Sequence, residues 1–319
     1  MKKGVRNALI GAGLTLGAGV ACAVSGKWLV DIYLHRKNIT EFTTDKSVLS
    51  PENVEALNNN SEIPKGSEFY KSTPHMKLTI KNRANENINA LFYKNPSGSN
   101  VYVIYCHGYN ASAQDNSHMA MHHYEMGYNV LMPHMRAHKG SDHKYCTMGW
   151  LERLDLIDWA RFIAATNKDC KIVLHGLSMG AGTVMMATGE KLPENVVCAI
   201  EDCGYTSVYD EYRAQIWNVA HLPPFPSLAI FRSLAKRIAG FDIKEASAVE
   251  AVKKSKTPTL FIHGDADTFV PFWMLDVVYE SAACEKEKIV FAGADHATSA
   301  TKYPELYWES VKTFIEKYI

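Results

Sequence analysis

The pentapeptide Gly176-Leu-Ser-Met-Gly180 restricts the fold of this chain more than any other feature. It directly follows the apolar run Lys171–His175 and opens a segment, Met179–Lys191, with helical periodicity. A turn this tight between a strand and a helix holds the serine in a strained conformation, and a Cβ at either flanking position would clash with neighbouring backbone. We therefore expect Ser178 to be a nucleophile presented at the end of a buried strand.

Short apolar runs alternate with helical segments from Met76 to the end of the chain. This alternation predicts an α/β fold with a mostly parallel, eight-stranded sheet, helices on both faces and an antiparallel first pair of strands. The expected strands are Lys77–Lys81, Ile88–Tyr93, Val101–Cys106, Asn129–Met132, Lys171–His175, Val196–Glu201, Thr259–His263 and Lys288–Phe291. The expected helices are Asp115–Met126, Trp150–Thr166, Met179–Lys191, Pro271–Ala283 and Pro304–Tyr318.

One segment, Gly204–Val252, is too long for a simple connection between two strands. It contains a Pro-rich stretch and the amphipathic run Ser227–Ile238. Long connections inside a compact domain usually carry function, so we expect a helical cap over the site at about residues 204–252. Ordinary packing of these helices on the sheet edge is the alternative.

A serine hydroxyl needs a base, and the base needs an acid that orients it. His296 is the expected base because it lies between the last strand and the terminal helix, after the nucleophile and the acid in chain order. Asp267 is the expected acid because it follows a strand and is free to reach across the end of the sheet. Asp265 and Asp202 also follow strands and remain rivals.

Attack by the serine creates an oxyanion, which preorganised N–H donors stabilise. The backbone N–H of Met179, the residue after the nucleophile, is one expected donor. The second is the N–H of Tyr109, because Gly108 before it permits the turn that directs this group inward. We expect no metal in the mechanism.

Four motifs resemble those of the α/β-hydrolase superfamily over about residues 76–319: GLSMG, HGYN, HGDADTFVP and GADH. Through CGYTS, KEAS and SKTPTLFIHGDADTFVPF the chain is similar to membrane-anchored bacterial hydrolases of the YqkD type, in the serine aminopeptidase-like or lysophospholipase-like branch. The resemblance implies the triad Ser178, Asp267 and His296, the oxyanion donors Tyr109 and Met179, and no cofactor.

The loop Pro133–Ser141 departs from the pattern of many relatives, which read PDxRGHGxS. Here His134, Ala137 and Lys139 replace the aspartate and the two glycines. The departure leaves the triad intact but changes the expected conformation of this loop. Several histidines lie in and before it, at positions 118, 122, 123, 134, 138 and 143, but without the carboxylate or cysteine spacing of a zinc site. We therefore expect no metal site.

Composition narrows the substrate class. The chain has 34 basic and 34 acidic residues, so no overall field favours nucleic acid, and none is expected as a partner. The apolar cap favours an uncharged small-molecule ester or acyl substrate. The expected pocket residues are His107, Trp217, Phe225 and Phe231.

These features together predict a serine hydrolase that cleaves carboxylic esters through an acyl-enzyme. Peptide or amide hydrolysis, as in aminopeptidase-like relatives, and acyl transfer use the same triad and are alternatives. A binding protein that kept the fold after losing activity is the alternative from another class.

The N-terminal residues 1–37 have a separate character. Three basic residues precede the apolar, Gly-rich run Ala8–Val24, and a second apolar patch follows at Trp28–Leu34. We expect a single-pass membrane anchor with the catalytic domain outside the cell. The alternatives are a signal peptide cleaved near Ala21–Ala23, which would release a secreted protein, and a helix packed on the domain. Residues 38–75 are polar and are expected to form a linker or covering segment before the hydrolase domain at 76–319.

Overall fold

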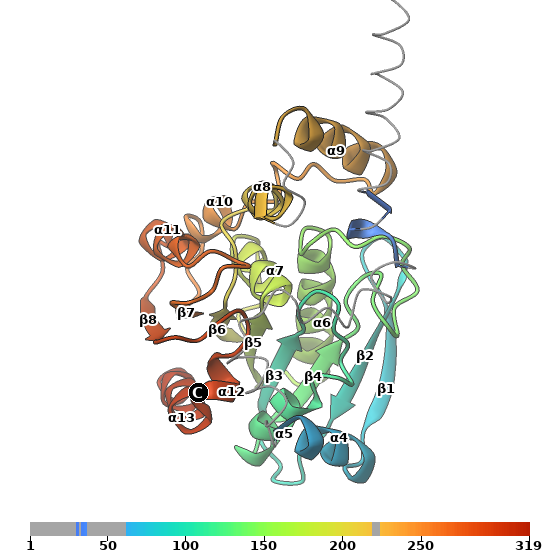
Figure 1. The fold of residues 1–319 in the computed structure, drawn as a ribbon. Helices are drawn as coiled ribbons and strands as arrows, with labels where there is room; N and C mark the ends of the chain where they lie inside the picture. Colours follow the sequence, from blue (N-terminus) through green and yellow to red (C-terminus); the bar gives the residue numbers. More distant parts are fainter. Residues whose placement is uncertain (1–29, 32, 37–61, 219–223) are drawn as a thin grey trace, which may run out of the picture.

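The computed structural model describes residues 30, 31, 33–36, 62–218 and 224–319. Its centre is an eight-stranded sheet in the order β1-β2-β4-β3-β5-β6-β7-β8 (Figure 1). The strands are β1 (Met76–Lys81), β2 (Asn87–Tyr93), β3 (Val101–Cys106), β4 (Asn129–Pro133), β5 (Lys171–Leu177), β6 (Val196–Asp202), β7 (Thr259–Gly264) and β8 (Lys286–Phe291). Every expected strand is present, within about two residues at each end.

Strand direction follows the expected pattern. β2 is antiparallel to both β1 and β4, and the pairs from β4 through β8 are parallel. Parallel strands place their carboxyl ends at one edge of the sheet, and this edge is where open α/β sheets bind ligands. The α/β-hydrolase fold expected from the sequence is confirmed.

Helices cover both faces of the sheet, because the central strands are apolar on both sides. One face packs against α4 (Glu62–Ser72), α5 (Ser117–Glu125) and α13 (Pro304–Glu316). The other packs against α6 (Glu152–Thr166), α7 (Met179–Thr188), α10 (Ala248–Val252) and α11 (Trp273–Ser281). The short α12 (Ser299–Lys302) precedes α13. Helix α4 lies within the segment expected to be a linker, where the ring of Phe69 packs 5.0 Å from that of Tyr93.

The segment expected to form a cap contains α8 (Val208–Asn218) and α9 (Pro224–Ile238) before α10, and Figure 1 shows α8 and α9 beyond one end of the sheet. Tyr212 of α8 packs edge-on against Phe231 of α9, with ring centroids 4.7 Å apart. Gln215 of α8 donates a hydrogen bond to the carbonyl of Phe269 at 2.6 Å. Helix α8 therefore lies against the loop that follows β7.

The described residues of the N-terminal segment pack on the domain. Val30 and Leu34 are fully buried in its apolar core. The Leu34 carbonyl accepts a hydrogen bond from the Cys146 N–H at 2.8 Å, and Arg36 N–H donates to the Lys144 carbonyl at 3.0 Å. This part of the apolar patch at 28–34 is therefore core, whereas the run at 8–24 lies outside the described residues. Across the described part of the chain, no helix combines the length and the apolar character that a membrane crossing requires.

Candidate functional site

Ser178 lies at the junction of β5 and α7 in a backbone conformation that only this tight turn enforces. Its φ is 55° and its ψ is −115°, a strained combination for a residue with a Cβ. A Cβ at Gly176 would lie 2.2 Å from the Gly180 carbonyl oxygen, and one at Gly180 would lie 1.9 Å from that of Cys106. Both glycines are therefore sterically required for the turn.

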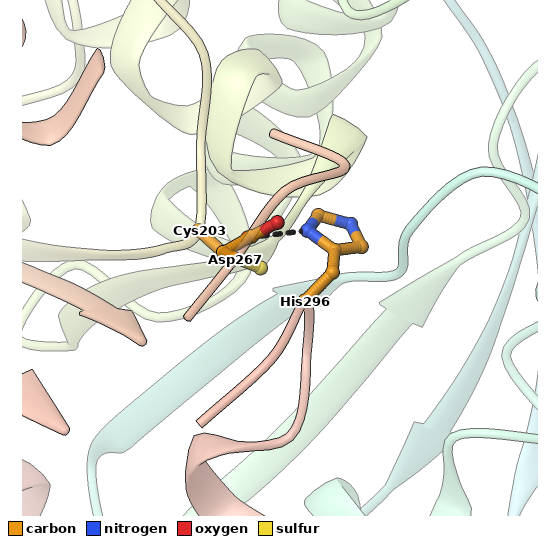
Figure 2. A group of neighbouring side chains, drawn as sticks. All are labelled: Cys203, Asp267 and His296. Carbon is orange, nitrogen blue, oxygen red and sulfur yellow. Dashed lines mark hydrogen bonds and ion pairs between the residues drawn. The ribbon is translucent and has the colours of Figure 1, made fainter. Parts of the chain in front are cut away.

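Loops from two other strands bring a histidine and a carboxylate to this serine. The Nε2 atom of His296, after β8, lies 2.8 Å from the Ser178 Oγ. The Nδ1 atom of the same ring lies 2.7 Å from Oδ2 of Asp267, after β7, and Figure 2 shows this contact. A serine, an imidazole and a carboxylate thus form one hydrogen-bonded chain, although 118 residues separate Ser178 from His296.

The environment of Asp267 keeps its carboxylate ionised. Its Oδ1 accepts hydrogen bonds from the backbone N–H groups of Phe269 and Val270, both at 2.9 Å. Burial alone would raise the pKa of Asp267, but the charge of His296 and the hydrogen bonds from His263 and His296 outweigh it and lower that pKa to about 2. For His296 burial opposes the cation, yet the charge of Asp267 raises the pKa above its usual value.

A second imidazole contacts the same carboxylate oxygen. Nε2 of His263, the penultimate residue of β7, lies 3.1 Å from Asp267 Oδ2 and 3.0 Å from the Val270 carbonyl oxygen. Burial lowers the pKa of His263, and the hydrogen bond and charge of Asp267 more than reverse this effect. Two imidazoles therefore share the Oδ2 atom of Asp267.

The turn after β3 lies beside the serine. A Cβ on Gly108 would lie 3.4 Å from the Ser178 Cβ and 3.9 Å from its Oγ. Tyr109 follows directly, and its hydroxyl donates to the Tyr33 carbonyl at 2.9 Å, which anchors its side chain. Met179 is the first residue of α7, where a backbone N–H has no partner within the helix. Both expected oxyanion donors thus belong to segments adjacent to Ser178.

The prolyl oligopeptidase family has a sequence model that matches residues 115–319, which is more than half of the chain. The chain belongs to the prolyl oligopeptidase family. The matched residues include all three members of the hydrogen-bonded chain, and the Ser178–His296 contact has the geometry that nucleophilic catalysis requires. The protein is therefore a serine hydrolase of the esterase and peptidase type.

The chain is also similar to individual proteins. The uncharacterized protein YqkD of Bacillus subtilis is 29% identical over 216 residues, which cover 67% of this chain and 70% of YqkD. The Pyrococcus furiosus esterase Pf2001 superposes with a TM-score of 0.64 at 24% identity, covering 80% of this chain and 95% of the esterase. An acylaminoacyl peptidase of Pyrococcus horikoshii superposes with a TM-score of 0.55 at 14% identity, covering 79% of this chain and 42% of the peptidase. The structural matches support the fold.

Cys203 is a member of this site that the sequence did not indicate. It follows β6, is 1% exposed, and lies beside Asp267 and His296 (Figure 2). One donor atom from each of the three residues lies within 4.8 Å of the others. A soft divalent cation could bind these donors only by displacing the proton that His296 shares with Asp267. Burial raises the pKa of the Cys203 thiol well above its ordinary range, which opposes the thiolate that such binding needs.

The rival aspartates have other partners. Asp265 accepts a hydrogen bond from the Gly293 N–H at 2.5 Å and so joins the loop after β7 to the loop after β8. Asp202, at the end of β6, accepts one from the Tyr307 hydroxyl at 2.9 Å, and its other carboxylate oxygen is buried without a partner. Its own carbonyl accepts the Ser178 N–H at 2.7 Å. Neither carboxylate forms a hydrogen bond with His296 among the contacts described.

A buried chain of polar side chains extends from Asp202 away from the serine. The Tyr307 hydroxyl lies 3.2 Å from His175 Nε2, and His175 Nδ1 lies 2.9 Å from His123 Nε2. Both histidines are fully buried, and burial lowers the pKa of each. This chain joins β5, β6, α5 and α13 below the site, and no sequence motif indicated it.

Three of the four residues expected to line a substrate pocket have side chains that the structure describes. His107 is fully buried, with its ring nitrogens 2.9 Å from the Gly108 carbonyl and 3.3 Å from the Met135 N–H. Phe231 is 1% exposed in the α8–α9 contact, whereas Phe225 is 80% exposed. The side chain of Trp217 lies outside the described residues. His107 and Phe231 are thus buried, and their place in a substrate pocket stays a prediction.

The histidines near α5 also have separate partners. Nε2 of His122 lies 2.6 Å from the Glu62 carboxylate, while His123 faces His175. His138 Nε2 accepts the Asn110 N–H at 3.1 Å, which ties the loop after β4 to the turn that contains Tyr109. These contacts join α5 to α4 and β5, and the loop after β4 to the turn after β3.

Proposed function

We propose that the protein hydrolyses carboxylic esters through an acyl-enzyme on Ser178. His296 Nε2 takes the hydroxyl proton as Ser178 Oγ attacks the ester carbonyl, and it then donates that proton to the departing alcohol. Water, deprotonated by the same imidazole, attacks the acyl-enzyme, releases the acid and restores the serine. The observation that carries the proposal is the 2.8 Å contact between Ser178 Oγ and His296 Nε2, extended by the 2.7 Å contact to Asp267.

The supporting groups have defined roles in this proposal. Asp267 holds the Nδ1–H tautomer of His296 and stabilises its cation during attack. The N–H groups of Met179 and Tyr109 bind the oxyanion, and losing one such donor typically lowers the rate by about 10²- to 10³-fold. The balanced net charge of the chain and the fold shared with a known esterase favour an uncharged acyl substrate.

Peptide hydrolysis is the second candidate, because the family model that matches this chain is that of prolyl oligopeptidases and an acylaminoacyl peptidase shares the fold. The same serine and histidine serve either leaving group. An amine leaving group needs stronger protonation by His296 than an alcohol does, so relative rates on matched esters and amides separate the two activities.

The test is turnover of p-nitrophenyl esters of short and medium acyl chains, beside aminoacyl p-nitroanilides. We expect ester hydrolysis to dominate, and Ser178→Ala to abolish both turnover and labelling by a fluorophosphonate probe. Ser310→Ala, which alters an exposed serine on α13, is the matched control and should keep full activity. Full activity in the Ser178→Ala protein would refute the proposal, whereas dominance of the anilides would assign a peptidase.

For location, we propose that residues preceding Val30 anchor the domain at the cell membrane, on the basis of the basic N-terminus and the apolar run Ala8–Val24. Carbonate extraction of the full-length protein followed by N-terminal sequencing tests this proposal. Retention in the membrane with an intact N-terminus supports the anchor, and a soluble product beginning near Val24 supports a cleaved signal.

A further inference from the structure

A cavity of about 300 Å³ lies apart from the triad, between the β1–β2 pair, the residues before α5 and the loop after β4. Its lining includes Lys77 of β1, Tyr70 of α4, Gln114, and both His134 and Lys139 of the loop. None of the described residues that line it is an aspartate or a glutamate. The positive charges at its rim are therefore not neutralised within the lining.

The two lysines also lack carboxylate partners elsewhere in the described part of the chain. Lys139 Nζ donates to the neutral Gln114 side chain at 3.3 Å. A pair of unneutralised ammonium groups on one cavity attracts an anion.

Two exposed carboxylates contact residues that line the cavity but do not line it themselves. Asp142 is 3.5 Å from the Asn89 amide, and Asp115 accepts the Ser112 hydroxyl at 2.6 Å. Solvent screens both of these acids, since each is exposed. The lysines are the nearer charges for an occupant of the cavity.

His134 and Lys139 are two of the three residues at which this loop departs from the pattern PDxRGHGxS of many relatives. A carboxylate at position 134 would repel an anion, while an imidazole can donate to it. The His134 ring packs against the loop backbone, where a Cβ on Gly140 would lie 2.4 Å from its Nδ1 atom. Burial lowers the pKa of His134, a backbone hydrogen bond at Lys139 raises it in part, and the charges of Lys77 and Lys139 lower it further. A bound anion would offset those charges.

We propose that this cavity is a binding site for a phosphate-sized oxyanion, held by Lys77 and Lys139 with His134 beside it. The cavity adjoins the carboxyl end of β4, at the sheet edge where α/β folds bind ligands. Its volume suits a small ligand or the head group of a larger one. The proposal does not depend on ester hydrolysis at Ser178.

The first experiment is calorimetric titration of inorganic phosphate into the full-length protein, at an ionic strength held constant with chloride. We expect saturable binding that weakens by roughly tenfold or more in the Lys77→Gln/Lys139→Gln protein. The Lys168→Gln/Lys256→Gln protein has the same charge change at exposed residues before β5 and β7, and it should bind as the unaltered protein does. Absence of saturable binding, or equal affinity in both double variants, would overturn the proposal.

The second experiment reads the site directly. In side-chain NMR, phosphate should raise the pKa of His134 in the unaltered protein and leave it unchanged in Lys77→Gln/Lys139→Gln. An unmoved His134 pKa at saturating phosphate would contradict the proposed position of the ligand.

A third arm identifies the source of the phosphoryl group. Phosphatidylglycerol vesicles are compared with phosphatidylcholine vesicles for competition with phosphate. Competition by the anionic vesicles that depends on Lys77 and Lys139 assigns a lipid head group, and phosphate binding without such competition assigns a soluble anion.

Discussion

Asp267 and Asp202 follow neighbouring strands at the same edge of the sheet, and burial is almost equal, at 3% and 1% exposure. Their ionisation differs. Two backbone N–H groups and two imidazoles surround Asp267, and its pKa falls to about 2 despite burial. Asp202 has the Tyr307 hydroxyl and one unpaired oxygen, and burial raises its pKa to about 6.

The comparison indicates that hydrogen-bond donors, rather than depth in the protein, determine which of the two aspartates stays ionised beside His296. Both aspartates lose solvent, which disfavours their charged forms. Only Asp267 receives enough donors to offset that loss. The position of a carboxylate at a strand end is therefore insufficient evidence for its role.

The largest expected difference is in turnover. Asp267→Asn should lower kcat by about 10⁴-fold, because the amide favours the wrong tautomer of His296. Asp202→Asn should lower it by less than about tenfold, since a charge without a hydrogen bond to His296 changes its pKa by about one unit at most. Steady-state kinetics on the same p-nitrophenyl ester measures both variants. Equal losses in the two proteins would remove the distinction between the acids.

The same substitutions should change stability with opposite pH dependence. The depressed pKa of Asp267 contributes about 2 kcal/mol above pH ~4, which is lost as the pH falls toward 2. The raised pKa of Asp202 does the reverse: full stability below pH ~4 falls by about 3 kcal/mol as the pH rises through 6.

Urea unfolding followed by tryptophan fluorescence checks this expectation. Between pH 4 and pH 7, Asp202→Asn should gain stability relative to the unaltered protein, whereas Asp267→Asn should show its changing difference only below pH ~4. If the difference in free energy of unfolding between Asp202→Asn and the unaltered protein stayed constant across that range, the pKa of the Asp202 carboxyl would not be raised.

The smallest effect concerns the second imidazole at Asp267. His263→Leu leaves Asp267 Oδ2 to His296 alone, so the pKa of His296 should rise and the acid limb of kcat/KM should move upward by up to about one pH unit. His263→Gln keeps a donor at this position and should shift the limb less. A folded, active His263→Leu protein with an unmoved acid limb would show that the two histidines do not compete.

The sequence predicted the strands of the sheet and the meeting of Ser178, Asp267 and His296, because local sequence signals mark the strands and each of these three positions. Strand alternation, the two flanking glycines and the loops after β7 and β8 are each visible within a few residues. The orientation of Asp267 toward His296 then follows from strand order at one sheet edge.

The remaining features depend on contacts between distant segments. Cys203 shows no motif, and the chain from Asp202 through Tyr307 to His175 joins residues 105 and 132 positions apart. Phe225 and Phe231 are the same residue type and lie six positions apart in similar sequence surroundings. Only the packing of α8 on α9 decides that Phe231 is buried and Phe225 exposed. Hydrophobic pattern alone cannot make that choice.

The packing of residues 30, 31 and 33–36 on the domain determines how far the N-terminus of the protein can be truncated. The Tyr33 backbone carbonyl accepts a hydrogen bond from the Tyr109 hydroxyl, while Val30 and Leu34 fill apolar space in the core. A soluble form that begins at residue 38 would uncover that space and leave the turn beside Ser178 without its outer support. A form that begins a few residues before Val30 would retain both, so the practical starting point for crystallisation lies upstream of the boundary that composition suggests.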